Sequence, residues 1–190
     1  SGQDHLGIYR RNGNEYLEGM IGAYKARVAP FNVNYRYVAE ELAYLLADAR
    51  AEAVVYHSVF APTLAAVRDQ LPHLRVLLQV ADDSEAPLLD GAEWYEDALS
   101  GQPNELDDSL RAGWSPDDLY ILYTGGTTGM PKGVLWRQAD IFVAALGGRQ
   151  SSGEEWPSLE AIGEVAANGG ARLMPSPPFM HGAAHWMAFN

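Results

Sequence analysis

Residues 123–133 form a segment whose residue types suit the binding of a polyphosphate. Its sequence is Tyr-Thr-Gly-Gly-Thr-Thr-Gly-Met-Pro-Lys-Gly. The glycines allow backbone N–H groups to turn toward an anion, and the three threonine hydroxyls add neutral hydrogen-bond donors. Lys132 supplies a positive charge at the exit of the segment, and Pro131 restricts the backbone just before it. The segment therefore predicts a nucleotide or phosphate loop.

This loop differs from the P-loop of NTPases. In a P-loop, glycine directly precedes the lysine and a hydroxyl residue follows it, whereas here Pro131 precedes Lys132 and Gly133 follows. A flexible surface turn is the plain alternative for any Gly- and Thr-rich string. The apolar strand expected before the loop favours the binding function. The scarcity of lysine also favours it, since the chain holds lysine only at Lys25 and Lys132.

His181 and His185 are the second candidates for chemistry. On a helix, this spacing of four places two side chains on one face, as in some metal sites. The residues between them, 182–184, include no acidic residue, and no third ligand is near in the sequence. Three interpretations stay open: a metal pair, an ordinary core or capping role, and, for His181, a place in a substrate site.

Short apolar runs alternate with helical periodicity along the chain, which is typical of βαβ units. Strands are expected at residues 6–9, 29–33, 53–56, 75–80, 119–123, 133–136 and 171–174. Helices are expected at residues 15–27, 38–49, 63–71, 94–99, 140–146 and 159–167, with a surface loop at 147–157. The sequence thus predicts an α/β fold with a mostly parallel β-sheet flanked by helices, in which the phosphate loop directly follows a strand.

Composition excludes several classes of protein. The 190 residues are 47% hydrophobic and 20% charged, and no apolar run approaches the length of a membrane span. No secretory signal is visible at the start of the sequence. The absence of cysteine excludes disulfides, thiolate metal sites and a cysteine nucleophile, and it fits a reducing compartment such as the cytoplasm. The net charge of −12 argues against nucleic acid as a partner.

Most of the negative charge lies in one stretch. Residues 82–118 hold twelve acidic residues and a single basic one, Arg111, so this stretch carries −11 of the formal charge. Such a run is usually a solvated surface. Because negative charge beside a phosphate loop would repel its ligand, we expect these carboxylates to point away from the loop.

The loop sequence resembles the AMP-binding signature of the adenylate-forming superfamily, which includes acyl-CoA synthetases, nonribosomal peptide adenylation domains and luciferases. Gly125 stands where many members have serine, which removes one hydroxyl. Residues 134–142 resemble a bacterial fatty-acyl-CoA synthetase branch, and residues 22–27 and 32–36 resemble the same enzymes. Residues 177–184 resemble the family element Pro-x-aromatic-His-x-x-Gly, with Met180 at the aromatic position and Ala184 at the glycine position. The resemblance covers essentially the whole chain.

The resemblance implies an acyl-CoA synthetase. In such enzymes a carboxylate attacks the α-phosphate of ATP to give acyl-adenylate, and the thiol of coenzyme A then displaces AMP. A fatty acid is the expected acid, and ATP, Mg²⁺ and coenzyme A are the expected cofactors. The residues carried over as nucleotide contacts are Thr124, Gly125, Gly126, Thr127, Thr128, Gly129 and Lys132. Thr128 is also a candidate Mg²⁺ contact, and His181 is expected to line the acyl or adenylate site; the resemblance assigns no catalytic residue within the chain.

Further motifs of the family have no counterpart before Asn190, among them the later acidic motif of the Mg²⁺ site and the lysine of the C-terminal domain. Residues 1–190 are therefore expected to be part of an N-terminal AMP-binding domain, cut at both ends, without the C-terminal domain and inactive alone. Three alternatives stay open: an adenylation domain for amino or aryl acids, a catalytically inactive nucleotide- or acyl-binding module, and an unrelated phosphate-binding α/β protein. Acyl chain length, oligomeric state and peripheral membrane association are left open.

Overall fold

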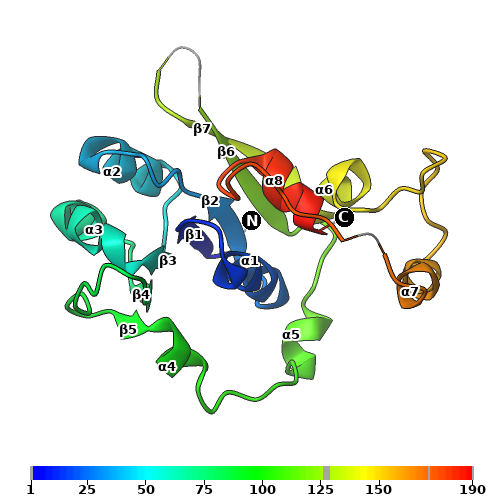
Figure 1. The fold of residues 1–190 in the computed structure, drawn as a ribbon, viewed down its shortest axis with the longest axis horizontal. Coiled ribbons are helices and arrows are strands. Elements are labelled where there is room, and N and C mark those ends of the chain that lie inside the picture. The colour runs from blue at the N-terminus through cyan, green and yellow to red at the C-terminus, as the bar shows by residue number, and fades with distance from the viewer. Residues whose placement is uncertain (1, 126–128, 171, 190) are drawn as a thin grey trace.

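A seven-stranded β-sheet forms the centre of the protein in a computed structural model, which describes residues 2–125, 129–170 and 172–189. The strands are β1 (His5–Tyr9), β2 (Ala29–Asn32), β3 (Ala53–His57), β4 (Val76–Val80), β5 (Glu93–Trp94), β6 (Leu119–Thr124) and β7 (Lys132–Arg137). Their order across the sheet is β5-β4-β3-β1-β2-β6-β7. Neighbouring strands are parallel except β6 and β7, which form an antiparallel pair. The predicted α/β fold with a mostly parallel sheet is confirmed (Figure 1).

The described helices are α1 (Asn14–Lys25), α2 (Ala39–Asp48), α3 (Ala61–Val67), α4 (Tyr95–Leu99), α5 (Asp108–Ala112), α6 (Gln138–Ala145), α7 (Leu159–Ala167) and α8 (Gly182–Phe189), with short 3₁₀ turns at Ser58–Phe60 and Arg68–Gln70. Of these, α2 and α3 pack on one face of the sheet, and α1, α6 and α8 pack on the other. Because the four pairs of neighbouring strands from β5 to β2, and the pair β2 and β6, are parallel, their carboxyl ends share one edge of the sheet. Ligands of open α/β sheets bind at this edge.

The alternation of side chains along each strand divides the core between the two faces of the sheet. On β6, Ile121 and Tyr123 belong to the cluster that packs against α2 and α3, whereas Tyr120 and Leu122 belong to the cluster that packs against α1, α6 and α8. On β2, Phe31 faces the α2 and α3 side. The next residue, Asn32, is therefore directed to the opposite face, which is covered by α1 and α8. This placement of one polar residue matters for the site.

The strand expected at residues 171–174 is wrong for residues 172–174, which adopt no regular structure; residue 171 lies outside the described residues. Leu173 is 65% exposed and Met174 is 88% exposed. An apolar run forms a strand only where a neighbouring strand can pair with its backbone, and no strand in the described part of the chain pairs with this one. The short helix α5 was not among the helices predicted from the sequence. Asp107 caps α5 by accepting a hydrogen bond from the backbone N–H of Ser109 at 2.7 Å.

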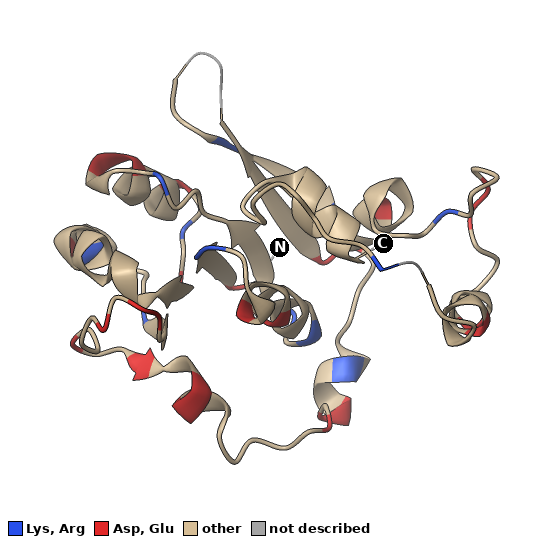
Figure 2. Ribbon diagram, viewed as in Figure 1, with Lys and Arg blue, Asp and Glu red and all other residues tan. Residues whose placement is uncertain are grey.

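In Figure 2, β5, α4 and α5, which carry many of the acidic residues, lie toward the bottom of the view, whereas the end of β6 and the start of β7 lie toward the top. The segments that hold these residues are therefore remote from the described ends of the loop, and the direction of their carboxylates stays a prediction. Asp118, at the end of the stretch, is buried: it is 5% exposed and pairs with Arg27. In the part of the chain that the structure describes, no helix combines the length and apolar character needed to cross a membrane.

Candidate functional site

The predicted nucleotide loop connects β6 to β7, at the edge of the sheet where β6 ends. The antiparallel register places Thr124 directly opposite Lys132, and both side chains are exposed. Gly129 has φ +149°, a backbone conformation that favours glycine. Gly125 is exposed, with open space where a Cβ would lie. The structure thus brings Thr124 and Lys132 together at the base of the loop, while Gly126, Thr127 and Thr128 lie outside the described residues.

Tyr123 fixes the base of this loop to the rest of the domain. A Cβ at Gly133, its partner across the hairpin, would lie only 3.0 Å from the Tyr123 ring, so any other residue there would require the ring to shift. The Tyr123 hydroxyl donates a hydrogen bond to the Asp48 carboxylate at 2.6 Å, and its ring packs edge-on against Phe31. Burial, followed by the hydrogen bond to Asp48, raises the pKa of Tyr123 well above its usual range, so the phenol stays protonated and remains a donor.

Asn32 connects this strand to the segment that carries His181. Its side-chain oxygen accepts a hydrogen bond from the Tyr123 backbone N–H at 2.8 Å. Its side-chain nitrogen donates to the carbonyl of Tyr123 at 2.9 Å and to the carbonyl of Met180 at 2.6 Å. Asn32 is 4% exposed. One buried amide therefore contacts the residue before Thr124 and the residue before His181.

His185 lies in α8 and holds the same segment from the other side. Its Nδ1 is 2.7 Å from the carbonyl of Phe179, so Nδ1 carries the proton. Its Nε2 then accepts a hydrogen bond from the Tyr120 hydroxyl at 2.6 Å, and the Trp186 indole N–H donates to that hydroxyl at 3.1 Å. Burial lowers the pKa of His185 to about 4, which keeps the ring neutral at neutral pH.

These contacts decide between the interpretations of the two histidines. Both ring nitrogens of His185 are hydrogen-bonded within the fold, so it has the ordinary core role rather than that of a metal ligand. His181 directly precedes α8 and is exposed, and its place in a substrate site stays a prediction. Among the described residues, no group of three His, Asp or Glu side chains could hold a metal ion.

Two asparagines that position the segment at 178–181, Asn32 and Asn12, were not predicted from the sequence. Asn12 accepts a hydrogen bond from the backbone N–H of Phe179 at 2.7 Å through its side-chain oxygen. The available signal was an asparagine at the end of an otherwise apolar strand. Burying an amide is costly unless it is hydrogen-bonded, which marks such a residue as one with specific partners.

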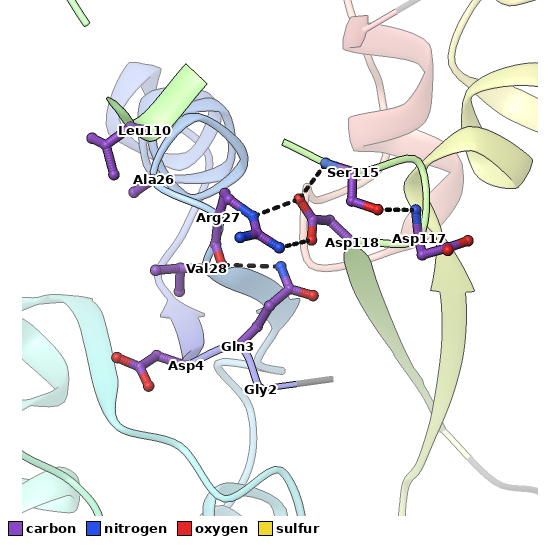
Figure 3. Close-up of a pocket in the computed structure, with 10 residues that line it drawn as sticks. All are labelled: Gly2, Gln3, Asp4, Ala26, Arg27, Val28, Leu110, Ser115, Asp117 and Asp118. Atoms are coloured by element: carbon purple, nitrogen blue, oxygen red, sulfur yellow. Dashed lines mark hydrogen bonds and ion pairs between the residues drawn. The ribbon is translucent and has the colours of Figure 1, made fainter. Parts of the chain in front are cut away.

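A cavity of about 600 Å³ lies elsewhere, where α1 leads into β2 and the chain enters β6 (Figure 3). Arg27 and Asp118 form a two-point ion pair across it, with nitrogen–oxygen distances of 3.0 and 2.8 Å. The hydrogen bonds from Arg27 hold the pKa of Asp118 below its usual range. Arg27 lies just before β2 and Asp118 just before β6, so the cavity is at the amino edge of the sheet. The ion pair ties two strand entries together, and none of the described loop residues lines this cavity.

Comparison with known proteins identifies the family. Residues 1–190 match the family model described as AMP-binding enzyme, and the chain belongs to this family. It is 57% identical over 190 residues to the medium-chain acyl-CoA ligase Mig of Mycobacterium avium, covering 97% of this chain and 34% of that protein. It is 40% identical over 191 residues to the 3-oxocholest-4-en-26-oate–CoA ligase of Rhodococcus rhodochrous, covering 98% of this chain and 34% of that protein.

A solved structure supports the fold. The chain superimposes on the inhibitor-bound N-terminal domain of FACL13 from Mycobacterium tuberculosis with a TM-score of 0.68 at 22% identity, covering 98% of this chain and 41% of that one. The present chain spans about a third of the length of the curated relatives it matches. The family match excludes the interpretation as an unrelated phosphate-binding α/β protein.

Proposed function

We propose that the full-length protein is an AMP-forming acid–thiol ligase, an acyl-CoA synthetase that activates a carboxylic acid with ATP and transfers the acyl group to coenzyme A. The observation that carries this proposal is the base of the nucleotide loop, where Lys132 lies opposite Thr124 and Asn32 joins the same strand to the segment of His181. A fatty acid is the proposed acid, supported by the likeness to the medium-chain ligase.

The chemistry explains why such a loop is needed. A carboxylate is a poor acyl donor because its leaving group would be an oxide. In the first step, a carboxylate oxygen bonds to the α-phosphorus of ATP while the bond to pyrophosphate breaks. In the second step, the thiol sulfur bonds to the acyl carbon and the bond between this carbon and the bridging oxygen breaks. AMP leaves with that oxygen, and the thiol proton is released to solvent. Catalysis of such steps depends mainly on positioning and electrostatic stabilisation.

The described residues supply part of that positioning. The exposed ammonium of Lys132 would offset phosphate charge, and the exposed hydroxyl of Thr124 would donate to a phosphate oxygen. Gly125 and Gly129 would let the backbone approach the phosphates. Gly126 would do the same and the hydroxyls of Thr127 and Thr128 would donate to phosphate oxygens, although these three residues lie outside the described residues. Mg²⁺ would offset the charge of the released pyrophosphate. The described residues provide no carboxylate set for the ion.

Carboxylate-dependent exchange between ATP and pyrophosphate by the full-length protein tests the proposal, with a panel of fatty, aryl and amino acids. We expect exchange with a fatty acid and a loss of roughly 100-fold or more in Lys132→Ala, comparable to the loss of one transition-state donor in other enzymes. Lys25→Ala is the matched control, because Lys25 is the only other lysine of the chain and lies exposed at the end of α1. Binding of ATP without exchange for any acid would contradict the proposal and indicate an inactive binding module.

A further inference from the structure

We propose that Asn32 is a positioning residue that couples the nucleotide loop to the segment of His181, an inference that rests on the proposed function. Its side-chain amide can donate two hydrogen bonds, and both are formed in the structure. One goes to the carbonyl of Tyr123 at 2.9 Å and the other to the carbonyl of Met180 at 2.6 Å. These two residues are separated from Asn32 by 91 and 148 positions in the chain.

The orientation of this amide is fixed by its partners. Carbonyl oxygens only accept hydrogen bonds, so the NH₂ group must face Tyr123 and Met180, and the oxygen must face the Tyr123 N–H. A flipped amide would place its oxygen against two other oxygens. The network therefore has one arrangement, and each of its three bonds depends on the same rigid planar group.

Where β2 ends, the side chain of Asn32 replaces the β2 backbone as the hydrogen-bonding partner of β6. The backbone register between the two strands aligns Phe31 with Ile121. Two residues further along β6, the side chain of Asn32 bonds both the N–H and the carbonyl of Tyr123, as a neighbouring strand would. Pairing of β6 with its β2 side thus extends to the residue before Thr124, and the remaining hydrogen bond fixes the backbone one residue before His181. Any displacement of one segment acts on the other through this amide.

The chain offers a matched control in Gln79, a second buried side-chain amide. Gln79 is 0% exposed and lies near the end of β4. It donates to the Ser58 hydroxyl and the Pro87 carbonyl, both at 3.0 Å, and accepts from the Tyr56 hydroxyl at 2.8 Å and the Leu89 N–H at 2.9 Å. None of these partners belongs to β6, the loop or residues 178–181. Asn32→Asp and Gln79→Glu each replace an NH₂ group by an oxygen of similar size.

Hydrogen exchange on the full-length protein tests the coupling without any need for activity. In Asn32→Asp, the carboxylate faces two carbonyl oxygens, and we expect faster exchange in residues 119–125 and in residues 178–184 together. Gln79→Glu should leave both segments as in the wild type and affect residues 81–89 instead. Faster exchange in only one of the two site segments, or the same pattern in both variants, would overturn the coupling. Asn32→Ser, which keeps a donor and adds no charge, is the second variant if Asn32→Asp does not fold.

Kinetics test the consequence for the reaction. Misplacement of a reacting group by about 1 Å can cost up to about 100-fold in rate. We therefore expect Asn32→Asp to lower kcat of carboxylate-dependent exchange by roughly 10- to 100-fold per folded molecule. Gln79→Glu should keep the wild-type kcat. An active wild type together with an unchanged kcat in folded Asn32→Asp would overturn the positioning role alone. An inactive wild type would overturn the proposed function, and hydrogen exchange would then still decide the coupling.

Discussion

In two regions along the carboxyl edge of the sheet, a buried side-chain amide at the end of a strand hydrogen-bonds to another segment, but the two segments differ. At the end of β4, the buried amide of Gln79 holds Pro87 and Leu89 of the loop that begins the acidic stretch. At the end of β2, the buried amide of Asn32 holds Tyr123 and Met180, which precede the candidate site residues. Gln79 shares its core face with Tyr56, on the α2 and α3 side, whereas Asn32 points to the α1 and α8 side.

The difference shows that a buried hydrogen-bond network does not by itself indicate a functional site. Both amides have their hydrogen-bonding groups well satisfied, and both should contribute to stability. What differs is the segment at the other end of each hydrogen bond. We therefore expect substitutions near Gln79 to change stability alone, and substitutions near Asn32 to change activity as well.

The largest expected effect is a loss of stability on truncating a side chain of the core that packs near Gln79. Leu64 of α3 is fully buried, and Leu64→Ala should lower the free energy of unfolding by about 2–5 kcal/mol, because the lost side chain leaves a cavity. Exchange activity per folded molecule should stay at the wild-type value. Val38→Ala, at a position that is 62% exposed, is the control and should change stability little. Loss of activity in the folded fraction of Leu64→Ala would contradict the expectation that changes near Gln79 affect stability alone.

The second effect is a pH dependence of stability that arises from His185, which holds the same segment as Asn32. The pKa of His185 is lowered by burial from 6.5 to about 4, so the unfolded chain binds this proton more readily than the folded one. The stability that neutral His185 provides is complete above pH 6.5 and is lost as the pH falls toward 4, by up to about 3 kcal/mol. Urea unfolding of the full-length protein between pH 7.5 and 4 measures this slope.

His185→Gln should flatten that slope, whereas His73→Gln, which replaces an exposed histidine, serves as the control. Hydrogen exchange in residues 178–184 should rise with falling pH in the wild type, because protonation breaks the hydrogen bond that Nε2 accepts from Tyr120. A stability profile that is the same in His185→Gln and the wild type would contradict the assignment of His185 as a buried neutral group.

The smallest effects come from two tyrosine hydroxyls, one in each region. Tyr56→Phe removes a hydrogen bond to Gln79, and Tyr123→Phe removes one to Asp48. Each should cost about 1 kcal/mol of stability, as single hydrogen bonds usually do. We expect only Tyr123→Phe to raise the KM for ATP, since Tyr123 fixes the base of the loop. Equal KM values in both variants would show that the phenol of Tyr123 acts on stability alone.

Most of the fold could be predicted from the sequence, because local patterns specify it. The apolar runs of β1, β3, β4 and β6 match the predicted strands closely, since buried parallel strands are continuous apolar segments. The failures lie where tertiary contacts decide. Leu173 and Met174 have strand-like composition and no partner strand in the described residues, and α5 forms from a capping residue inside what reads as turn composition.

The sequence by itself determined the loop of residues 123–133 and the family, because a Gly- and Thr-rich string before one of two lysines is a local feature. It could not determine that Asn32 joins that loop to His181, or that His185 is a neutral core residue. Asn32 meets its partners across 91 and 148 positions, and His185 meets Tyr120 across 65. Such pairs arise only when the order of the strands and the face of each residue are fixed, and both are properties of the folded sheet.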